Sequence, residues 1–439
     1  MATQFHRTVS SAGSDYKATF SAWVKRATPG VENFLLYAYY NSSNNHRLNF
    51  LNSDELHINI ITSASNSATI TTNRKFRDPN AWYHIVVAWD STQSTASDRI
   101  KIYVNGVQET SFSTSNYPSQ NADMFFNKNT NGLYLGGQDG SNQFQGVMSH
   151  VHYVDGTAYS ASTFGSTDSI TGEWRINTSP SVTYGTNGWL VFKDGNTYTD
   201  QSSNSNNLTL TGTAPTKTED CPSNVFATIN PLDNYYNSLT LSNGNTSWVS
   251  GSPYSVTRST LGASSGKYYF EMKVVNEGNT DYEFGIVGKA GTSVSSWMGS
   301  SGSYGYSYES NAKLRANGTT VNSWGSTYDD GDILGCAFDL DNNKIYFSKN
   351  GSWQQSGDPS SGSNGYTIVA AADTPAGAYF IGAGDFSGSS GQSGQFNFGN
   401  GYFGTTAVSS AGTNASNLGI FEYDVPSGFT ALCTKGLNE

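Results

Sequence analysis

Residues 331–351 have the sequence GDILGCAFDLDNNKIYFSKNG, which is the pattern of a β-hairpin. The apolar side chains of its first strand alternate onto one face, at Leu334, Cys336, Phe338 and Leu340. Residues 341–343, Asp-Asn-Asn, then turn the chain, and Ile345 and Phe347 return the apolar face along a second strand. This segment predicts one leaf of a β-sandwich.

A similar hairpin occurs early in the chain. Residues 82–90, WYHIVVAWD, lead through a polar loop to residues 99–107, RIKIYVNGV. Further strands are expected at residues 18–26, 33–40, 47–51, 56–61, 132–137 and 144–156. Short alternating segments at this spacing are typical of a sandwich. The sequence therefore predicts an all-β chain with two β-sandwich, jelly-roll-like domains in tandem.

Composition narrows the class of protein. The chain has 439 residues, of which 36% are hydrophobic and 13% aromatic, so each half has enough material for a core. Only 13% are charged, against roughly 25% in ordinary soluble domains, and Ser, Thr, Asn and Gly carry the solubility. Such a surface indicates an extracellular or virion-exposed protein.

The net charge of −11 argues against two kinds of partner. Nucleic acid and anionic membranes both attract a basic surface, so neither is expected to bind this chain. No apolar run approaches the roughly 18 residues needed for membrane insertion. Residues 1–8 lack the apolar core of a signal peptide, so we expect that the chain is not exported by itself.

The three cysteines, Cys221, Cys336 and Cys433, show no metal-binding spacing. Cys336 lies on the apolar face of the hairpin described above. We interpret all three as small hydrophobic residues, and a disulfide between Cys221 and Cys433 stays open as an alternative.

The first sandwich is expected over residues 1–215. It resembles the laminin G-like, concanavalin A-like family. The segments that carry this resemblance are FSAWVK at 20–25, WYHIVVA at 82–88, IYVNG at 102–106 and FQG at 144–146. Residues 216–245 follow as a bridging arm. Because Val225, Phe226, Ile229 and Leu232 are too apolar for a flexible linker, we expect this arm to pack on a domain.

The second sandwich is expected over residues 246–400 and resembles the SPRY family in the order and spacing of its segments. These are GKYYFEMKV at 266–274, YEFGIV at 282–287, SYGY at 303–306, the hairpin at 331–351 and AYFIG at 378–382. The resemblance implies a two-sheet sandwich that binds partners through loops at one end. Residues 401–439 are expected to pack on the sandwiches.

Taken in order, the two modules, residues 224–232 and the C-terminal segment resemble virion proteins of tailed bacteriophages, especially those from marine samples. The resemblance implies a fibre, appendage or capsid decoration that assembles in the host cytoplasm and is exposed on the particle exterior. Its expected partners are other virion proteins and host surface glycan, and particle symmetry could repeat it as a homo-oligomer. Two alternatives stay open: a purely structural capsid or tail component, and a polysaccharide depolymerase.

No catalytic residues are predicted. Glycosidases of the concanavalin A-like class need carboxylates at alternating positions of one strand face, and no such run occurs. The acidic residues at 329–332 and 339–341 fall at hairpin ends, where Asp serves turn geometry. The glycines never form a phosphate-binding loop, so no cofactor is expected.

Aromatic residues are the best candidates for binding, with 9 Trp, 27 Tyr and 23 Phe in the chain. Sugar-binding proteins stack a pyranose on an aromatic ring and hydrogen-bond its hydroxyl groups. Trp297, Trp324 and Trp353 lie in apparent loops of the SPRY-like half, and Tyr308 completes this set. We predict that these four residues contact a ligand or partner.

Two sets of residues are candidates for holding a metal. His150 and His152 should share one strand face, a spacing that suits a metal with a third ligand, although buried structural histidines are the main alternative. The laminin G-like resemblance implies calcium, for which Asp139 and Asp155 are weak candidates. Each of these two also fits an ordinary turn position, so calcium stays an open expectation.

Overall fold

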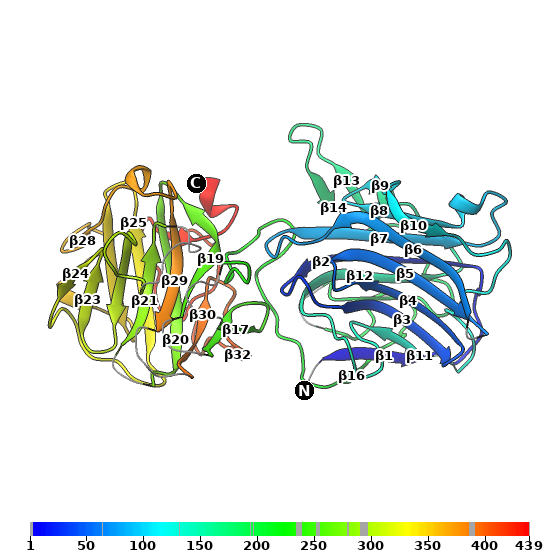
Figure 1. The fold of residues 1–439 in the computed structure, drawn as a ribbon, viewed down its shortest axis with the longest axis horizontal. Helices are drawn as coiled ribbons and strands as arrows, with labels where there is room; N and C mark the ends of the chain where they lie inside the picture. The colour runs from blue at the N-terminus through cyan, green and yellow to red at the C-terminus, as the bar shows by residue number, and fades with distance from the viewer. Residues whose placement is uncertain are drawn as a thin grey trace. The chain divides into compact units, whose positions relative to one another are not determined.

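The computed structural model describes residues 3–63, 65–130, 132–193, 195, 197–233, 239–251, 255–278, 281–289, 297–385 and 391–438. The chain divides into an N-terminal unit, Met1–Lys217, and a C-terminal unit, Thr218–Glu439. Each unit consists of stacked β-sheets (Figure 1), which confirms the predicted all-β class. The helical segments of the described ranges are short 3-10 turns. No helix in these ranges is long and apolar enough to span a membrane.

Two large sheets form the N-terminal unit. In the described residues, one has the order β10-β6-β5-β4-β3-β11-β1-β16 and the other the order β15-β12-β2-β7-β8-β9. The first sheet contains β1 Gln4–Thr8, β3 Asn33–Asn41, β4 Asn44–Phe50, β5 Glu55–Thr62, β6 Ser65–Lys75, β10 Phe112–Asn116, β11 Gly132–Leu135 and β16 Thr209–Thr211. The second contains β2 Lys17–Arg26, β7 Trp82–Asp90, β8 Ile100–Val104, β9 Val107–Gln108, β12 Gly146–Asp155 and β15 Trp189–Val191.

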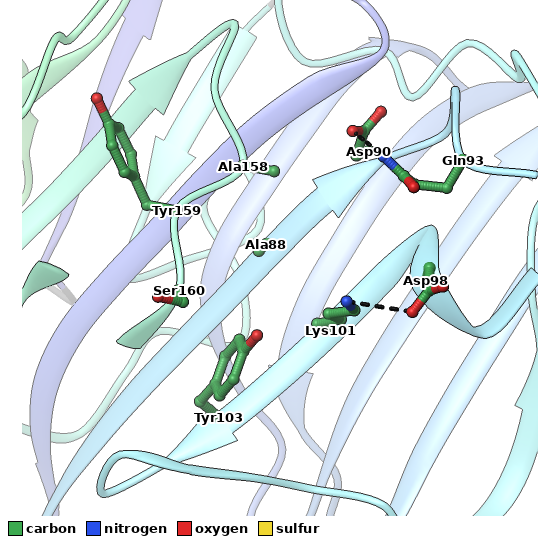
Figure 2. Close-up of a pocket in the computed structure, with 9 residues that line it drawn as sticks. All are labelled: Ala88, Asp90, Gln93, Asp98, Lys101, Tyr103, Ala158, Tyr159 and Ser160. Carbon is green, nitrogen blue, oxygen red and sulfur yellow. Dashed lines mark hydrogen bonds and ion pairs between the residues drawn. The ribbon is translucent and has the colours of Figure 1, made fainter. Parts of the chain in front are cut away.

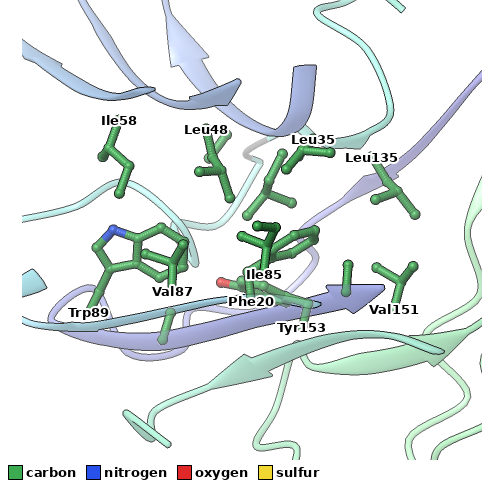
Figure 3. Close-up of a cluster of buried hydrophobic side chains, with 14 of the residues drawn as sticks. Phe20, Leu35, Leu48, Ile58, Ile85, Val87, Trp89, Leu135, Val151 and Tyr153 are labelled. Carbon is green, nitrogen blue, oxygen red and sulfur yellow. The ribbon is translucent and has the colours of Figure 1, made fainter. Parts of the chain in front are cut away.

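The core of the N-terminal unit lies between these two sheets. Leu35, Leu48 and Ile58 from the first sheet face Phe20 and Trp89 from the second (Figure 3), and all five are buried. Alternate residues of each strand therefore point inward, as the period of two requires. The register of β7 against β8 runs from Ile85 opposite Val104 to Trp89 opposite Ile100, which confirms the predicted early hairpin.

Three smaller elements cover the outer face of the second sheet. They are β13 Gly165–Thr167, β14 Trp174–Ile176 and the 3-10 helix Ala161–Thr163. Phe164 and Val154 form a small cluster there with the half-buried Tyr103, Tyr159 and Trp174. This second apolar layer shields part of the sheet from solvent and leaves the neighbouring part open.

The C-terminal unit also has two principal sheets. Within the described ranges, their orders are β17-β18-β30-β20-β25-β26-β27, with β28 beside β26 and β33 beside β20, and β19-β29-β21-β22-β23-β24. The first contains β17 Leu239–Ser242, β18 Ser247–Ser250, β20 Lys267–Asn276, β25 Ile333–Asp339, β26 Lys344–Lys349, β27 Ser352–Trp353, β28 Tyr366–Thr367, β30 Ser393–Asn397 and β33 Thr430–Ala431. The second contains β19 Val256–Ala263, β21 Tyr282–Val287, β22 Gly305–Glu309, β23 Lys313–Ala316, β24 Thr319–Val321 and β29 Tyr379–Asp385.

Strands β25 and β26 form the hairpin on which the fold prediction rested. Cys336 lies opposite Phe347 and Phe338 opposite Ile345, and all four are buried in the core of this unit. Asp339 holds the turn, because its Oδ1 accepts the backbone N–H groups of Asp341 and Asn342. The predicted alternation and turn are confirmed.

Residues on both flanks of the C-terminal sandwich pack onto it. Phe226 and Ile229 are buried, and the backbone N–H of Ala227 donates to the carbonyl oxygen of Leu432 at 3.0 Å. Leu232, which we had grouped with them, is exposed, and residues 234–238 of the bridging segment lie outside the described residues. Phe421 lies in a separate apolar cluster that includes Phe226.

The chain places its three thiols in different surroundings. Cys221 and Cys433 are not joined by a disulfide; Cys336 and Cys433 are buried and Cys221 is half-buried. Burial raises the pKa of Cys336 well above its ordinary value. We therefore expect one thiol per chain to react quickly with a thiol reagent in the native protein and three in denaturant. Three fast thiols in the native state would contradict the packing of β25.

Candidate binding surfaces

A hollow of about 260 Å³ lies on the outer face of the second sheet of the N-terminal unit. Its floor and walls come from β7, β8, the loop between them and a segment that follows β12. The lining residues are Ala88, Asp90, Gln93, Asp98, Lys101, Tyr103, Ala158, Tyr159 and Ser160 (Figure 2). Because Val87 and Trp89 point into the core, Ala88 and Asp90 must point outward into the hollow.

One side of the hollow is aromatic. Tyr103 projects from β8 and Tyr159 from the covering segment, and both rings are half-buried against the outer apolar cluster. Two hydrogen bonds fix Tyr159: its backbone N–H donates to Thr19 Oγ1 at 2.8 Å, and its hydroxyl accepts the N–H of Thr183 at 3.1 Å. The tyrosine side of the hollow is thus built on hydrogen-bonded structure.

The other side carries ionic and amide groups. Asp90 accepts hydrogen bonds from Thr92 and Gln93 and pairs with Lys17 at 3.2 Å. Burial opposes the ionisation of Asp90, but these partners together hold its pKa below the ordinary value. Asp98 pairs with Lys101 at 3.1 Å, and these two side chains are 42% and 35% exposed. Each carboxylate of the hollow therefore has its own lysine.

A buried Ser–His contact lies beneath the elements that cover the same sheet. It has a structural role and not a catalytic one. Ser21 Oγ is 2.9 Å from His84 Nε2, while the indole N–H of Trp174 donates to His84 Nδ1 at 2.9 Å. In a Ser-His-Asp triad, a carboxylate accepts a hydrogen bond from that second nitrogen. Burial lowers the pKa of His84 to about 3, so the imidazole stays neutral and anchors Trp174.

The four aromatic candidates of the C-terminal unit occupy different environments. Tyr308 and Trp324 are buried, with exposed fractions of 0% and 8%, and their ring centroids lie 5.6 Å apart. The Tyr308 hydroxyl donates to the carbonyl oxygen of Ser326. These two residues could therefore affect binding only indirectly, by holding the conformation of the loop that they support.

Trp353 and Trp297 remain partly accessible, since both are half-buried. Trp353 packs beside Tyr269 and the C-terminal segment, away from the Tyr308–Trp324 pair. Trp297 precedes Met298, whose N–H donates to the buried carboxylate of Glu283 at 2.8 Å. Ligand contact by any of the four residues stays a prediction.

The expected alternation of His150 and His152 on one strand face is wrong. The register of β12 against β2 shifts between Ser149 and His152, and His150 sits in this bulge with a φ of +47°. His152 is buried, with Nδ1 2.8 Å from the hydroxyl oxygen of Tyr184. Among the described residues, no group of three or more His, Cys, Asp or Glu is placed to hold a metal.

The two calcium candidates differ in their surroundings. Asp139 is exposed and has a φ of +45°, which is typical of a turn. Asp155 is buried and accepts hydrogen bonds from Ser14, Asn127 and Asn187. Since these donors already occupy its carboxylate, Asp155 ties together three segments of the N-terminal unit. Calcium binding remains untested.

Comparisons with known families support the two-domain composition. Residues 3–163 match the laminin G-type model of the Concanavalin A-like lectin/glucanases superfamily, and residues 267–401 match the SPRY domain. The chain therefore contains a laminin G-like, concanavalin A-like domain followed by a SPRY domain. Domains of these two kinds are typically binding modules without catalytic activity.

Several individual proteins are similar to parts of the chain. Ran-binding protein 9 of Danio rerio is 32% identical over 90 residues, which are 20% of this chain and 15% of that protein. Ran-binding protein 9 of Homo sapiens is 33% identical over 90 residues, which are 20% of this chain and 12% of that protein. The chain thus matches only a small part of the length of these relatives.

Two solved structures are also similar to parts of the chain. The SPRY domain of human HERC1 matches with a TM-score of 0.29 and 19% identity, over 38% of this chain and 96% of that one. A SAP-like pentraxin from Limulus polyphemus matches with a TM-score of 0.28 and 13% identity, over 40% of this chain and 92% of that one.

Proposed function

We propose that this protein is a non-enzymatic binding protein on the exterior of a tailed-bacteriophage particle. Its β-sandwiches would engage host surface glycan or another virion protein. The observation that carries the binding role is the hollow beside β7 and β8, which is lined by two tyrosines and by hydrogen-bonding groups. This combination suits a ligand with both an apolar face and hydroxyl groups. The virion location rests on the resemblance of the modules, taken in order, to phage structural proteins.

The chemistry of the hollow favours binding over hydrolysis. A glycosidase needs one carboxylic acid that keeps its proton, and this requires a raised pKa. Asp90 has a lowered pKa instead, and Asp98 is paired with Lys101. Outside the hollow, the pKa is raised for the buried Glu271, Glu283 and Glu309, whose carboxylates are enclosed by hydrogen-bonded protein groups and cannot reach a polysaccharide. Asp15 and Glu277 also have raised pKa values, and both lie outside the hollow.

The virion role can be tested on purified particles of a phage that encodes the chain. We expect gold-labelled antibodies against the chain to decorate intact particles, and the purified full chain to adsorb to host cells without releasing reducing sugar. Labelling that appears only after particles are disrupted would contradict the exterior location. Steady release of reducing sugar would contradict the non-enzymatic role.

A further inference from the structure

We infer that the hollow beside β7 and β8 binds one uncharged pyranose unit and discriminates against acidic sugars. The inference rests on the proposed glycan-binding function and assigns it a site and a ligand class. It follows from three properties of the hollow: its size, its charge balance and the arrangement of its two sides.

The size of the hollow suits a single sugar ring. Its volume of about 260 Å³ falls just below the roughly 300–1,000 Å³ of sites for drug-sized ligands. Strands β7 and β8 supply Ala88, Asp90, Lys101 and Tyr103, with Ala88 directly opposite Lys101 in the register. Because these positions belong to a paired sheet, the hollow is pre-formed and a ligand loses little affinity in ordering it.

The charge balance of the hollow favours a neutral ligand. Lys17 compensates Asp90 and Lys101 compensates Asp98, at 3.2 and 3.1 Å. A phosphate, sulfate or carboxylate would bring a negative charge beside two carboxylates, and the lining residues offer no cation other than the paired Lys101. The guanidinium of the neighbouring Arg99 is occupied by backbone carbonyl oxygens. A cationic ligand would likewise find both carboxylates already paired. An uncharged molecule meets neither penalty.

The two sides of the hollow match the two kinds of surface on a pyranose. The ring of Tyr103 can pack against the apolar C–H face of the sugar. The Asp98–Lys101 pair lies beside Tyr103 (Figure 2) and is accessible enough to accept one further hydrogen bond and donate another. Two neighbouring hydroxyl groups supply this combination, because one can donate to the carboxylate while the other accepts from the ammonium.

The inference is tested with the full chain and a panel of immobilised oligosaccharides that end in neutral hexoses, N-acetylhexosamines, uronic acids or sialic acid. We expect binding to neutral termini, and we expect Tyr103→Ala to weaken it about tenfold or more. Tyr40→Ala is the matched control, since Tyr40 is a 45% exposed tyrosine on β3 in the other sheet. It should bind like the wild type.

A charge variant separates recognition from folding. Asp98→Asn keeps the shape of the side chain and leaves Lys101 without its carboxylate, so relative binding of acidic termini should rise at least severalfold. Circular dichroism would verify that each variant is folded. Wild-type preference for acidic termini, or glycan binding that Tyr103→Ala leaves unchanged, would overturn this inference while leaving the proposed function intact. Failure to bind any member of the panel would overturn both the inference and the glycan part of the proposed function.

Discussion

Acidification from pH 7.5 to pH 5 is expected to lower the free energy of unfolding of the N-terminal unit and to raise that of the C-terminal unit. The N-terminal unit contains all six histidines of the chain, and three of them, His46, His84 and His152, are buried. Burial lowers the pKa of each to about 3, from a reference value of 6.5. Three neutral imidazoles are therefore locked into this fold.

The sign of the effect follows from proton binding. Between pH 6.5 and pH 3 the unfolded chain binds protons at these imidazoles and the native unit does not, so the native state loses stability as the pH falls. At pH 5 the loss is about 2 kcal/mol per histidine, because this pH lies about 1.5 pH units below the unfolded value. Asp15 has a raised pKa and acts in the opposite direction, but it is partly exposed and carries less weight.

Three buried carboxyl groups with raised pKa values, Glu271, Glu283 and Glu309, reverse the dependence in the C-terminal unit. Burial raises the pKa of Glu271 and of Glu283 to about 7, from a reference value of 4.5. Four donors oppose this rise at Glu271, because hydrogen bonds to a carboxylate favour its ionised form: the Tyr269 hydroxyl, the Asn397 amide, and the backbone N–H groups of Glu422 and Tyr423. The native unit keeps protons that the unfolded chain releases between pH 4.5 and 7. The stabilisation that these protonated carboxyl groups give to the native unit is complete below pH 4.5 and is lost as the pH rises to 7.

Calorimetry of the full chain at pH 7.5, 6 and 5 measures both trends. The transition of the N-terminal unit should move to lower temperature and that of the C-terminal unit to higher temperature. His46→Leu should remove about a third of the pH dependence of the first transition, because His46 lies among the core rings of Trp89 and Phe126. Ile58→Val, a core substitution at a position without a titratable group, is the control and should leave that dependence nearly unchanged. If both transition temperatures moved in the same direction, the opposite roles of the buried histidines and the buried glutamates would be contradicted.

Local patterns were sufficient to predict much of the fold. The hairpin of β25 and β26 was predictable because its apolar residues alternate strictly and Asp and Asn occupy its turn. Strand β6, Ser65–Lys75, was not predicted, because its sequence SNSATITTNRK is mostly polar and only Ala68 and Ile70 mark its inward face. Such a strand depends on pairing with β5 and β10 more than on its own composition.

The sites were less predictable than the strands, because they depend on contacts between distant segments. The loop position of Trp324 suggested an accessible ring, but Phe347 and Tyr308 enclose it. The outward positions Lys101 and Tyr103 of β8 could have been recognised from their alternation with Ile100 and Ile102. Tyr159 approaches them from a segment more than fifty residues later in the chain, and no local pattern indicates that meeting.

Asp54→Asn is expected to destabilise the N-terminal unit by about 3–5 kcal/mol, since it leaves a buried guanidinium without its counter-charge. Arg26 has no exposed side-chain surface, pairs with Asp54 at 2.9 Å and donates to the carbonyl oxygen of Phe76 at 2.6 Å. Its guanidinium also lies 4.5 Å from the centre of the Phe50 ring. Asparagine tolerates the φ of +76° at this position, so the substitution changes the charge more than the turn.

A second arginine on the same carboxylate supplies the matched control for Asp54→Asn. Arg77 lies 3.1 Å from Asp54 but is 59% exposed, so Arg77→Ala should cost only about 1 kcal/mol or less. The double variant Arg26→Met/Asp54→Asn should be more stable than Asp54→Asn alone, because no charge then remains buried without a partner. Urea unfolding measures all three variants. Equal losses for Asp54→Asn and Arg77→Ala would show that Arg26 does not depend on the Asp54 charge, and that the carboxylate acts mainly at the surface.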